Sequence, residues 1–260
     1  MSTPLRVVDD AACPEIWAMA ERAGWLPAAE PISVWQSRTC SPSAAAPVHS
    51  ALRRAGVVWL AARDQTASRL DSGVTVTSPL LAEGTRLPEL WLRPGRLVIL
   101  CELQPHQVWR FKGAMSAQAE PLLIAARLPS FRRAAAACEA QRVGAADLVL
   151  MRAWTTHGPR WLFSPSALEL DRAVAGAVGL DVGAVPHLAL WRRHFLFAPD
   201  LEPSRGLGLS LPSAHVAAPA SRVAALLGML ADVRADTARG WVNRHRVPRF
   251  VRQRLTRSVG

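Results

Sequence analysis

Histidine, cysteine and acidic residues could hold a metal ion or transfer protons, but their spacing in this chain matches no established arrangement for either task. The two nearest histidines, His187 and His194, lie seven residues apart with an apolar stretch between them. That spacing can place both on one face of a helix, yet the HExxH and CxxC patterns of zinc sites are absent. Two packed or surface histidines explain the pair more simply. We therefore expect no bound metal and no cofactor.

Motifs for nucleophilic catalysis and for phosphate binding are also missing. There is no GxSxG turn, and Gly206 and Gly208 lack the third glycine of a dinucleotide-binding loop. Glu169 and Asp171 form a carboxylate pair, but a solvated helix face beside arginines explains it better than acid–base catalysis. A catalytic pair of a cysteine and a histidine that are distant in sequence but adjacent in the fold remains an alternative. The sequence favours a protein that is not an enzyme.

The cysteines are too widely separated for a metal motif or a dense disulfide framework. Their positions are Cys13, Cys40, Cys101 and Cys138. We expect reduced, partly buried thiols.

Positive charge is concentrated at the C-terminal end of the sequence. The chain carries a net charge of +11, and residues 239–260 contain arginines but no acidic residue. These arginines are Arg239, Arg244, Arg246, Arg249, Arg252, Arg254 and Arg257. Clustered guanidinium groups can neutralise phosphates, so a nucleic-acid-binding protein is one alternative, although no helix-turn-helix, RNP or zinc-finger pattern accompanies them.

Tryptophan is unusually frequent, with 10 residues in the chain. Most of them should lie in the core, because tryptophan is characteristic of large cores as well as of interface hot spots. Trp241 stands beside Gly240 at the start of the basic segment. We therefore predict that Trp241, Arg244, Arg246, Arg249 and Arg252 bind a partner.

No segment approaches the roughly 20 consecutive apolar residues that a membrane-spanning helix needs. The first residues show neither the basic start nor the apolar run of a signal peptide. We expect a cytoplasmic protein without a membrane span.

The hydrophobic pattern predicts a mainly α protein: an irregular helical single domain with minor β elements and a proline-rich N-terminal connector. Residues 1–95 would hold N-terminal helices and the connector, loosely packed; residues 96–238 would form the helical core; residues 239–260 would be a basic tail. Apolar spacing and capping signals indicate helices at 12–24, 50–63, 118–143 (broken at Pro129), 167–178 and 221–239.

The remaining segments are less regular. Four prolines between 27 and 47 indicate an extended connector. The apolar run within 96–101 fits either a buried strand or a helical turn, and the two cannot be separated by periodicity at this length. Short alternating stretches near 74–77 and 207–211 predict minor strands.

Three segments resemble the cytosolic accessory proteins of bacterial type III secretion systems, the Hrp/Ysc class of sorting-platform scaffold subunits. Leu92-Arg93-Pro94-Gly95-Arg96-Leu97 is similar to the family's Leu-His-Pro-x-Arg-Leu segment, with Arg93 in place of the histidine. The other two are the helical middle, 128–180, and the Trp- and Arg-containing regions around Trp191 and 241–248.

The resemblance implies a non-enzymatic adaptor that links the basal-body ring to the cytoplasmic sorting platform. Its partners would be ring and platform subunits of the secretion apparatus. It also implies that Arg93, Pro94 and Arg96 belong to a docking segment for the N-terminal part.

Overall fold

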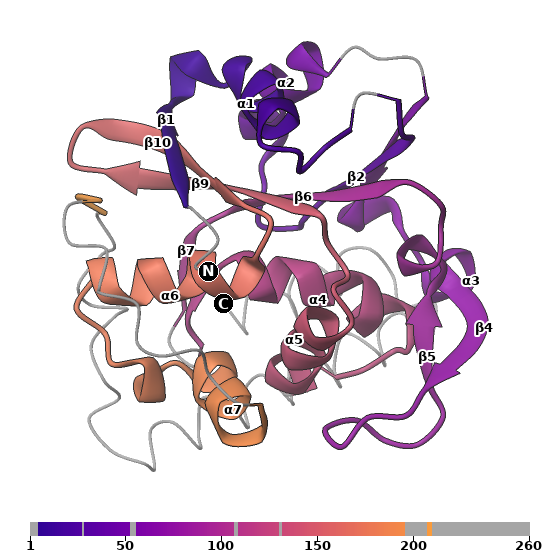
Figure 1. Cartoon of the computed structure of the whole chain (residues 1–260). Helices are drawn as coiled ribbons and strands as arrows, with labels where there is room; N and C mark the ends of the chain where they lie inside the picture. Colours follow the sequence, from indigo (N-terminus) through magenta and orange to yellow (C-terminus); the bar gives the residue numbers. More distant parts are fainter. Residues whose placement is uncertain are drawn as a thin grey trace, which may run out of the picture.

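The prediction of a mainly α protein is wrong, because the chain folds around a six-stranded mixed β-sheet with helices on both faces (Figure 1). The computed structural model describes residues 5–27, 29–52, 56–106, 109–129, 132–195 and 207–209. Within them the architecture is three-layered, helix over sheet over helix. It belongs to the α/β class.

The large sheet has the strand order β1-β10-β9-β6-β2-β3. Its strands are β1 (Arg6–Asp9), β2 (Ile32–Gln36), β3 (Val57–Ala61), β6 (Arg96–Glu102), β9 (Leu148–Thr155) and β10 (Gly158–Ser164). β3, β2, β6 and β9 run parallel, whereas β10 is antiparallel to both β9 and β1. Two small hairpins lie outside this sheet: β4 (Asp71–Val76) with β5 (Thr85–Pro88), and β7 (Gln104–His106) with β8 (Arg110–Lys112).

Helices cover the two faces of the sheet unequally. The helices are α1 (Glu15–Arg22), α2 (Pro42–Ala51), α3 (Ala67–Leu70), α4 (Ala114–Ala125), α5 (Arg133–Arg142), α6 (Ala167–Ala177) and α7 (Pro186–His194). α1 and α2 lie on the upper face in Figure 1, and α4, α5, α6 and α7 lie on the lower one. Each face buries its own apolar core against the sheet.

The burial of β6 explains why the apolar run within 96–101 fits either a strand or a helical turn by periodicity. Its five central residues are all buried, since helices pack on both faces of the sheet. Leu97, Ile99 and Cys101 face the α4–α7 layer, while Val98 and Leu100 face α1 and α2. A strand covered on both faces loses the apolar–polar alternation that identifies a half-exposed strand.

Two expectations for the N-terminal part fail. The segment 27–47 contains β2 and the start of α2 instead of a connector, because Pro42 occupies the first turn of α2, where a missing N–H costs nothing. The predicted helix at 50–63 is largely replaced by β3, whose β-branched Val57 and Val58 pair alongside β2. The apolar stripe read at helical spacing belongs to a strand.

Other expectations are confirmed. α1 falls within the predicted first helix, and α4 and α5 are two helices separated around Pro129. α6 begins as the capping signal indicates, with the hydroxyl of Ser166 accepting a hydrogen bond from the Glu169 N–H at 3.3 Å. Of the minor strand predicted near 207–211, residues 207–209 are described, and Leu209 forms only an isolated β-bridge with Thr155. The helix predicted at 221–239 and the tail at 239–260 lie outside the described residues.

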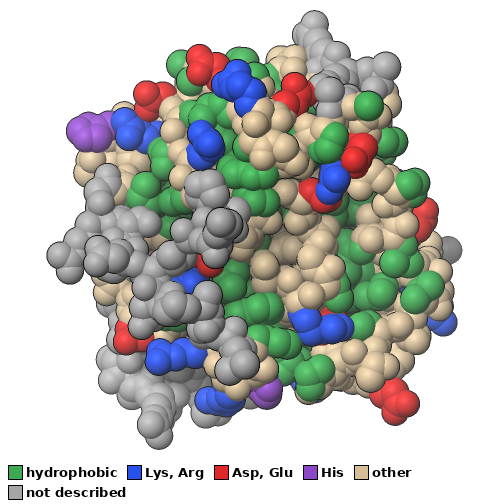
Figure 2. Space-filling view, viewed as in Figure 1, with side chains coloured by type: hydrophobic (Ala, Val, Ile, Leu, Met, Phe, Trp, Pro, Cys, Tyr) green, Lys and Arg blue, Asp and Glu red, His purple; other side chains and the backbone are tan. Residues whose placement is uncertain are grey.

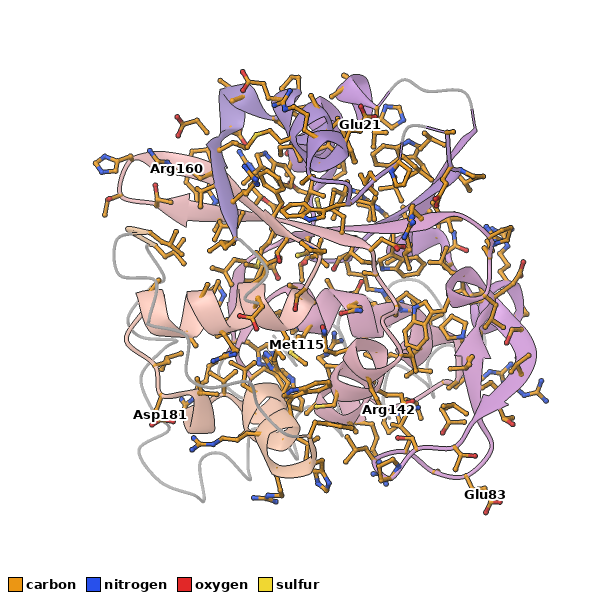
Figure 3. The ribbon with its side chains drawn as sticks, viewed as in Figure 1. Glu21, Glu83, Met115, Arg142, Arg160 and Asp181 are labelled. Carbon is orange, nitrogen blue, oxygen red and sulfur yellow. The ribbon has the colours of Figure 1, made fainter. Side chains whose placement is uncertain are left out.

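On the face seen in Figure 2, basic and acidic side chains of the described residues are interspersed and do not gather into one charged patch. The interior is apolar: Met115 of α4 is fully buried between sheet and helices, whereas Glu83 and Asp181 point away from the body (Figure 3). No helix among the described residues is both long enough and apolar enough to cross a membrane.

Candidate functional site

The topology of the sheet selects one edge as the place for a ligand. β2 continues through α2 on the upper face to β3, whereas β6 continues through α4 and α5 on the lower face to β9. The chain therefore leaves the carboxyl ends of the neighbouring strands β2 and β6 toward opposite faces of the sheet. Open α/β sheets bind ligands in the crevice at such a switch point.

Glu102, the last residue of β6, lies at the centre of this edge. Its Oε2 accepts a hydrogen bond from the backbone N–H of Ser41 at 2.7 Å, and its Oε1 lies 3.2 Å from a guanidinium nitrogen of Arg152. Arg152 also binds both carboxylate oxygens of Asp10, at 2.9 and 3.0 Å. This ion-pair chain joins the segment before α1, β9, β6 and the start of α2.

A second carboxylate reaches the same edge of the sheet from helix α4, which packs on the lower face. Glu120 of α4 is almost fully buried, and its Oε2 accepts hydrogen bonds from the Arg38 N–H at 3.0 Å and the Trp35 indole N–H at 3.4 Å. Ser37 and Thr39 close the loop with a hydroxyl–hydroxyl hydrogen bond of 2.9 Å.

The two carboxylates occupy positions that an anionic ligand would need. Backbone N–H groups between a strand and the following helix bind phosphate in nucleotide-binding folds. Here the N–H groups of Arg38 and Ser41 are bound to Glu120 and Glu102. These two N–H groups are thus already bound to side chains of the chain itself.

The four cysteines are poor nucleophiles. Burial raises the pKa of the Cys40 and Cys13 thiols to about 12, and it raises the pKa of Cys101 and Cys138 as well. The thiolate is the form that attacks substrates and binds metals. At neutral pH these side chains are protonated and pack as small apolar groups.

The histidine pair considered from sequence does not converge on a metal. His187 is buried and its Nε2 lies 3.0 Å from Oδ2 of Asp171, off the direction of an ideal hydrogen bond. Asp171 also accepts the backbone N–H groups of Ala114 and Met115, at 2.7 and 3.0 Å. It therefore holds the start of α4 against α6 and α7, and no group of three or more potential ligands exists in the described part of the chain.

Within the predicted docking segment, Arg96 forms ion pairs inside the domain. Its guanidinium binds both carboxylate oxygens of Glu30, at 2.6 and 3.2 Å, and Oδ1 of Asp147 at 2.8 Å. Its backbone N–H donates to the Pro31 carbonyl at 2.8 Å, and the Leu97 N–H donates to Asp147. These contacts tie together the amino ends of β2, β6 and β9.

The residues just before Arg96 form an exposed loop, which ends at the contacts that Arg96 makes with Glu30, Asp147 and Pro31. Leu92 is 49% exposed, and Arg93 pairs with Glu89 at 3.3 Å. Gly95 has φ of +99°, and a Cβ there would lie well inside van der Waals contact of the Pro31 carbonyl. The backbone of loop 92–95 is consequently anchored at Gly95 and Arg96, while the side chains of Leu92, Arg93 and Pro94 are exposed.

The other predicted partner-binding residues, Trp241, Arg244, Arg246, Arg249 and Arg252, lie outside the described residues. Sequence analysis missed Glu102, Glu120 and Arg152, because their roles depend on strands adjacent in the sheet and distant in the chain. The one local signal was Ser41-Pro42, a helix start directly after the apolar run of β2.

Comparisons with known proteins provide no relative: no family model, no curated protein and no solved structure matches this chain.

Proposed function

We propose that this chain is a non-enzymatic cytoplasmic adaptor of a bacterial type III secretion apparatus, and that loop 92–95 contacts its ring or platform partners. The partner class comes from the sequence resemblance. One observation carries the proposal: Leu92 and Arg93 are exposed, and Gly95 and Arg96 anchor the end of their loop to the domain. A rigid loop loses little conformational entropy on binding, so an apolar side chain presented on it can act as an anchor.

The hydrogen bonds at the switch point also favour binding over catalysis. Glu120 and Glu102 occupy the N–H groups of Arg38 and Ser41 that could otherwise bind a phosphate, and burial raises the pKa of the Cys40 thiol to about 12. The adaptor surface then lies on the outside of the domain.

The test is capture of purified ring and platform subunits by the full-length protein near physiological salt. Leu92→Asp and Arg93→Glu should each weaken capture at least tenfold, because one removes the apolar anchor and the other reverses a charge at the contact. Val74→Asp is the matched control, since Val74 is similarly exposed, at 47%, and belongs to β4, not to the loop. Far-UV circular dichroism should be unchanged in all three variants.

Retained capture by Leu92→Asp, or no capture by the wild-type protein, would contradict the proposal. Tight DNA binding at physiological salt that is lost on truncation after Gly240 would instead favour the nucleic-acid alternative. Phosphate contacts make such binding fall steeply as salt is raised.

A further inference from the structure

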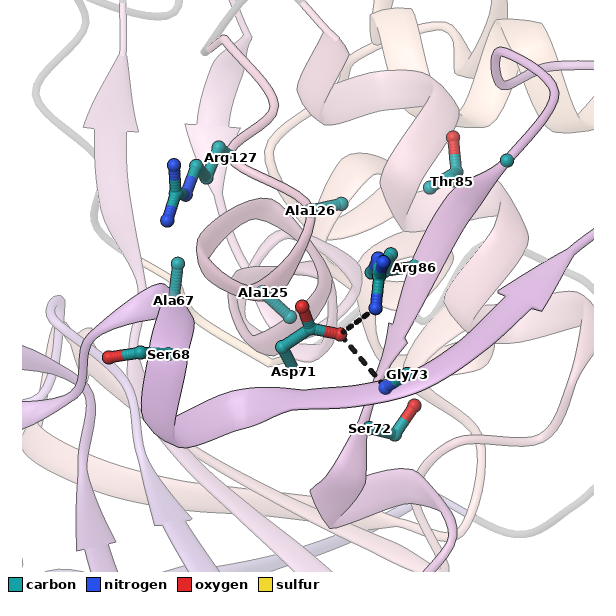
Figure 4. Close-up of a pocket in the computed structure, with 11 residues that line it drawn as sticks. Ala67, Ser68, Asp71, Ser72, Gly73, Thr85, Arg86, Ala125, Ala126 and Arg127 are labelled. Atoms are coloured by element: carbon teal, nitrogen blue, oxygen red, sulfur yellow. Dashed lines mark hydrogen bonds and ion pairs between the residues drawn. The ribbon is translucent and has the colours of Figure 1, made fainter.

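A cavity of about 630 Å³ lies beside the small β4–β5 hairpin, at the end of α4 (Figure 4). Its wall is formed by α3, β4, β5 with the residue before it, and the last turn of α4. The lining residues are Ala67, Ser68, Asp71, Ser72, Gly73, Gly84, Thr85, Arg86, Ala125, Ala126 and Arg127. The volume lies within the range of small-molecule sites.

Three charged side chains line this cavity, and two of them are arginines. Arg86 lies 3.3 Å from Oδ1 of Asp71, which also accepts the Gly73 N–H at 2.9 Å. Arg127 stands on the other side of Ala125 and Ala126 from Arg86 (Figure 4). It makes no ion pair among the described residues, although its positive charge contributes to the lowered pKa of Asp71. The lining therefore carries a net positive charge.

Arg127 occupies a backbone position that normally requires glycine. Its φ is +51°, directly after α4, with its N–H donating to the Ile124 carbonyl and the Leu128 N–H donating to the Leu123 carbonyl. These are the two hydrogen bonds of a Schellman helix end, whose left-handed residue is usually glycine.

The same chain ends three other helices in this way, each time with glycine. Gly24 after α1, Gly144 after α5 and Gly179 after α6 have φ of +73°, +64° and +71°. The residue that follows each of them donates back to the helix as Leu128 does. Only α4, among these four matching ends, places a side chain at the strained position.

The helix dipole does not by itself explain an arginine there. A cation near a helix C-terminus is favourable, but it needs no left-handed residue. α1 and α5 carry Arg22 and Arg142 inside their last turns, in ordinary helical geometry, and leave the next strained position to glycine. Strain that is retained at a single residue beside a cavity is a feature of functional sites.

We infer that this cavity binds a small organic anion, whose phosphate or carboxylate group is held by Arg127 together with Arg86. Guanidinium groups bind both kinds of anion through paired hydrogen bonds. Ala67, Ala125 and Ala126 leave an apolar floor for the rest of the ligand. This site is independent of loop 92–95 and of the proposed adaptor function.

The experiment is calorimetric titration of the full-length protein at constant ionic strength with two probes of similar size, glycerol 3-phosphate and succinate. Binding of at least one probe is expected, and the preferred probe identifies the anionic group. Arg127→Gly should weaken that binding at least tenfold while raising Tm by about 2 °C or more, because it removes the guanidinium and the backbone strain together. Arg127→Ala should weaken binding equally without the gain in Tm.

Arg22→Ala is the control for net charge, since Arg22 is exposed on α1 and should leave binding unchanged. Three outcomes overturn the inference. They are failure of both probes to bind, unchanged affinity in Arg127→Gly, and a lower Tm in Arg127→Gly. The last result would mean that Arg127 serves the α4 dipole and not a ligand.

Discussion

The carboxylate of Glu102 accepts the backbone N–H of Ser41 at 2.7 Å, so the end of β6 fixes the start of α2. The contact crosses the switch point of the sheet. It satisfies one of the free N–H groups at the helix start with a negative charge, which is favourable for both partners. The hydrogen bond between Glu102 and Ser41 therefore stabilises the domain.

Glu102→Ala should consequently lower the free energy of unfolding by about 2–3 kcal/mol. The variant leaves the Ser41 N–H without its acceptor and removes one of the two carboxylates that bind the largely buried Arg152. Glu102→Gln should cost about half as much, since an amide oxygen can still accept from Ser41. Urea unfolding of the three proteins measures the difference, and equal stability of Glu102→Ala and wild type would show that the network contributes nothing.

The close approach of Gly95 to Pro31 leads to a second prediction. Gly95→Ala should destabilise the domain by about 3 kcal/mol or more, since alanine is strained at φ of +99° and its Cβ would overlap the Pro31 carbonyl. Gly144→Ala is the matched control: its φ is also positive, +64°, but a Cβ there meets nothing within 4 Å.

The control should lose only about 1 kcal/mol, the strain of a left-handed alanine. The difference between the two variants in urea unfolding then measures the steric overlap with Pro31 together with the extra strain of alanine at φ of +99° relative to +64°. If they lose equal stability, the amino ends of β2 and β6 adjust freely at this point, and loop 92–95 is less rigid than the proposed function requires.

Sequence patterns predicted α1, α4, α5 and α6, missed β2 and β3, and left the β6 run open between a strand and a helical turn. α6 was identified because Ser166 and Glu169 give a local capping signal and the helix buries one face. β2 and β6 lie under helices on both sides, so their runs carry no period of two. Without recognised strands, the remaining apolar spacing indicated a helical protein.

The site was less predictable than the fold for a different reason. Arg96 was singled out as part of a docking segment, but its partners Glu30 and Asp147 lie just before other strands, and no local pattern links them. Arg127 was not singled out, because only the structure shows that it takes the position that glycine takes at the ends of α1, α5 and α6.

The last prediction concerns pH. Burial, together with the nearby charges of Lys112 and Arg133, lowers the pKa of His106 to about 4. Its Nδ1 accepts the Trp109 N–H at 3.2 Å, so protonation at this nitrogen would break the hydrogen bond. An unfolded histidine has a pKa near 6.5. Below that pH the unfolded chain takes up a proton that the folded chain does not, and the folded state loses stability until the pH reaches about 4.

Between pH 6.5 and pH 4.5 this linkage should lower the free energy of unfolding of the wild-type protein by about 2 kcal/mol. His106→Asn should remove that part of the pH dependence, because an amide oxygen can replace Nδ1 as acceptor without titrating. His157→Asn, a change at an exposed histidine in the β9–β10 hairpin, is the control and should follow the wild type. Urea unfolding at the two pH values measures all three proteins. Identical pH dependence in His106→Asn and wild type would mean that His106 is as accessible to protons in the folded protein as in the unfolded chain.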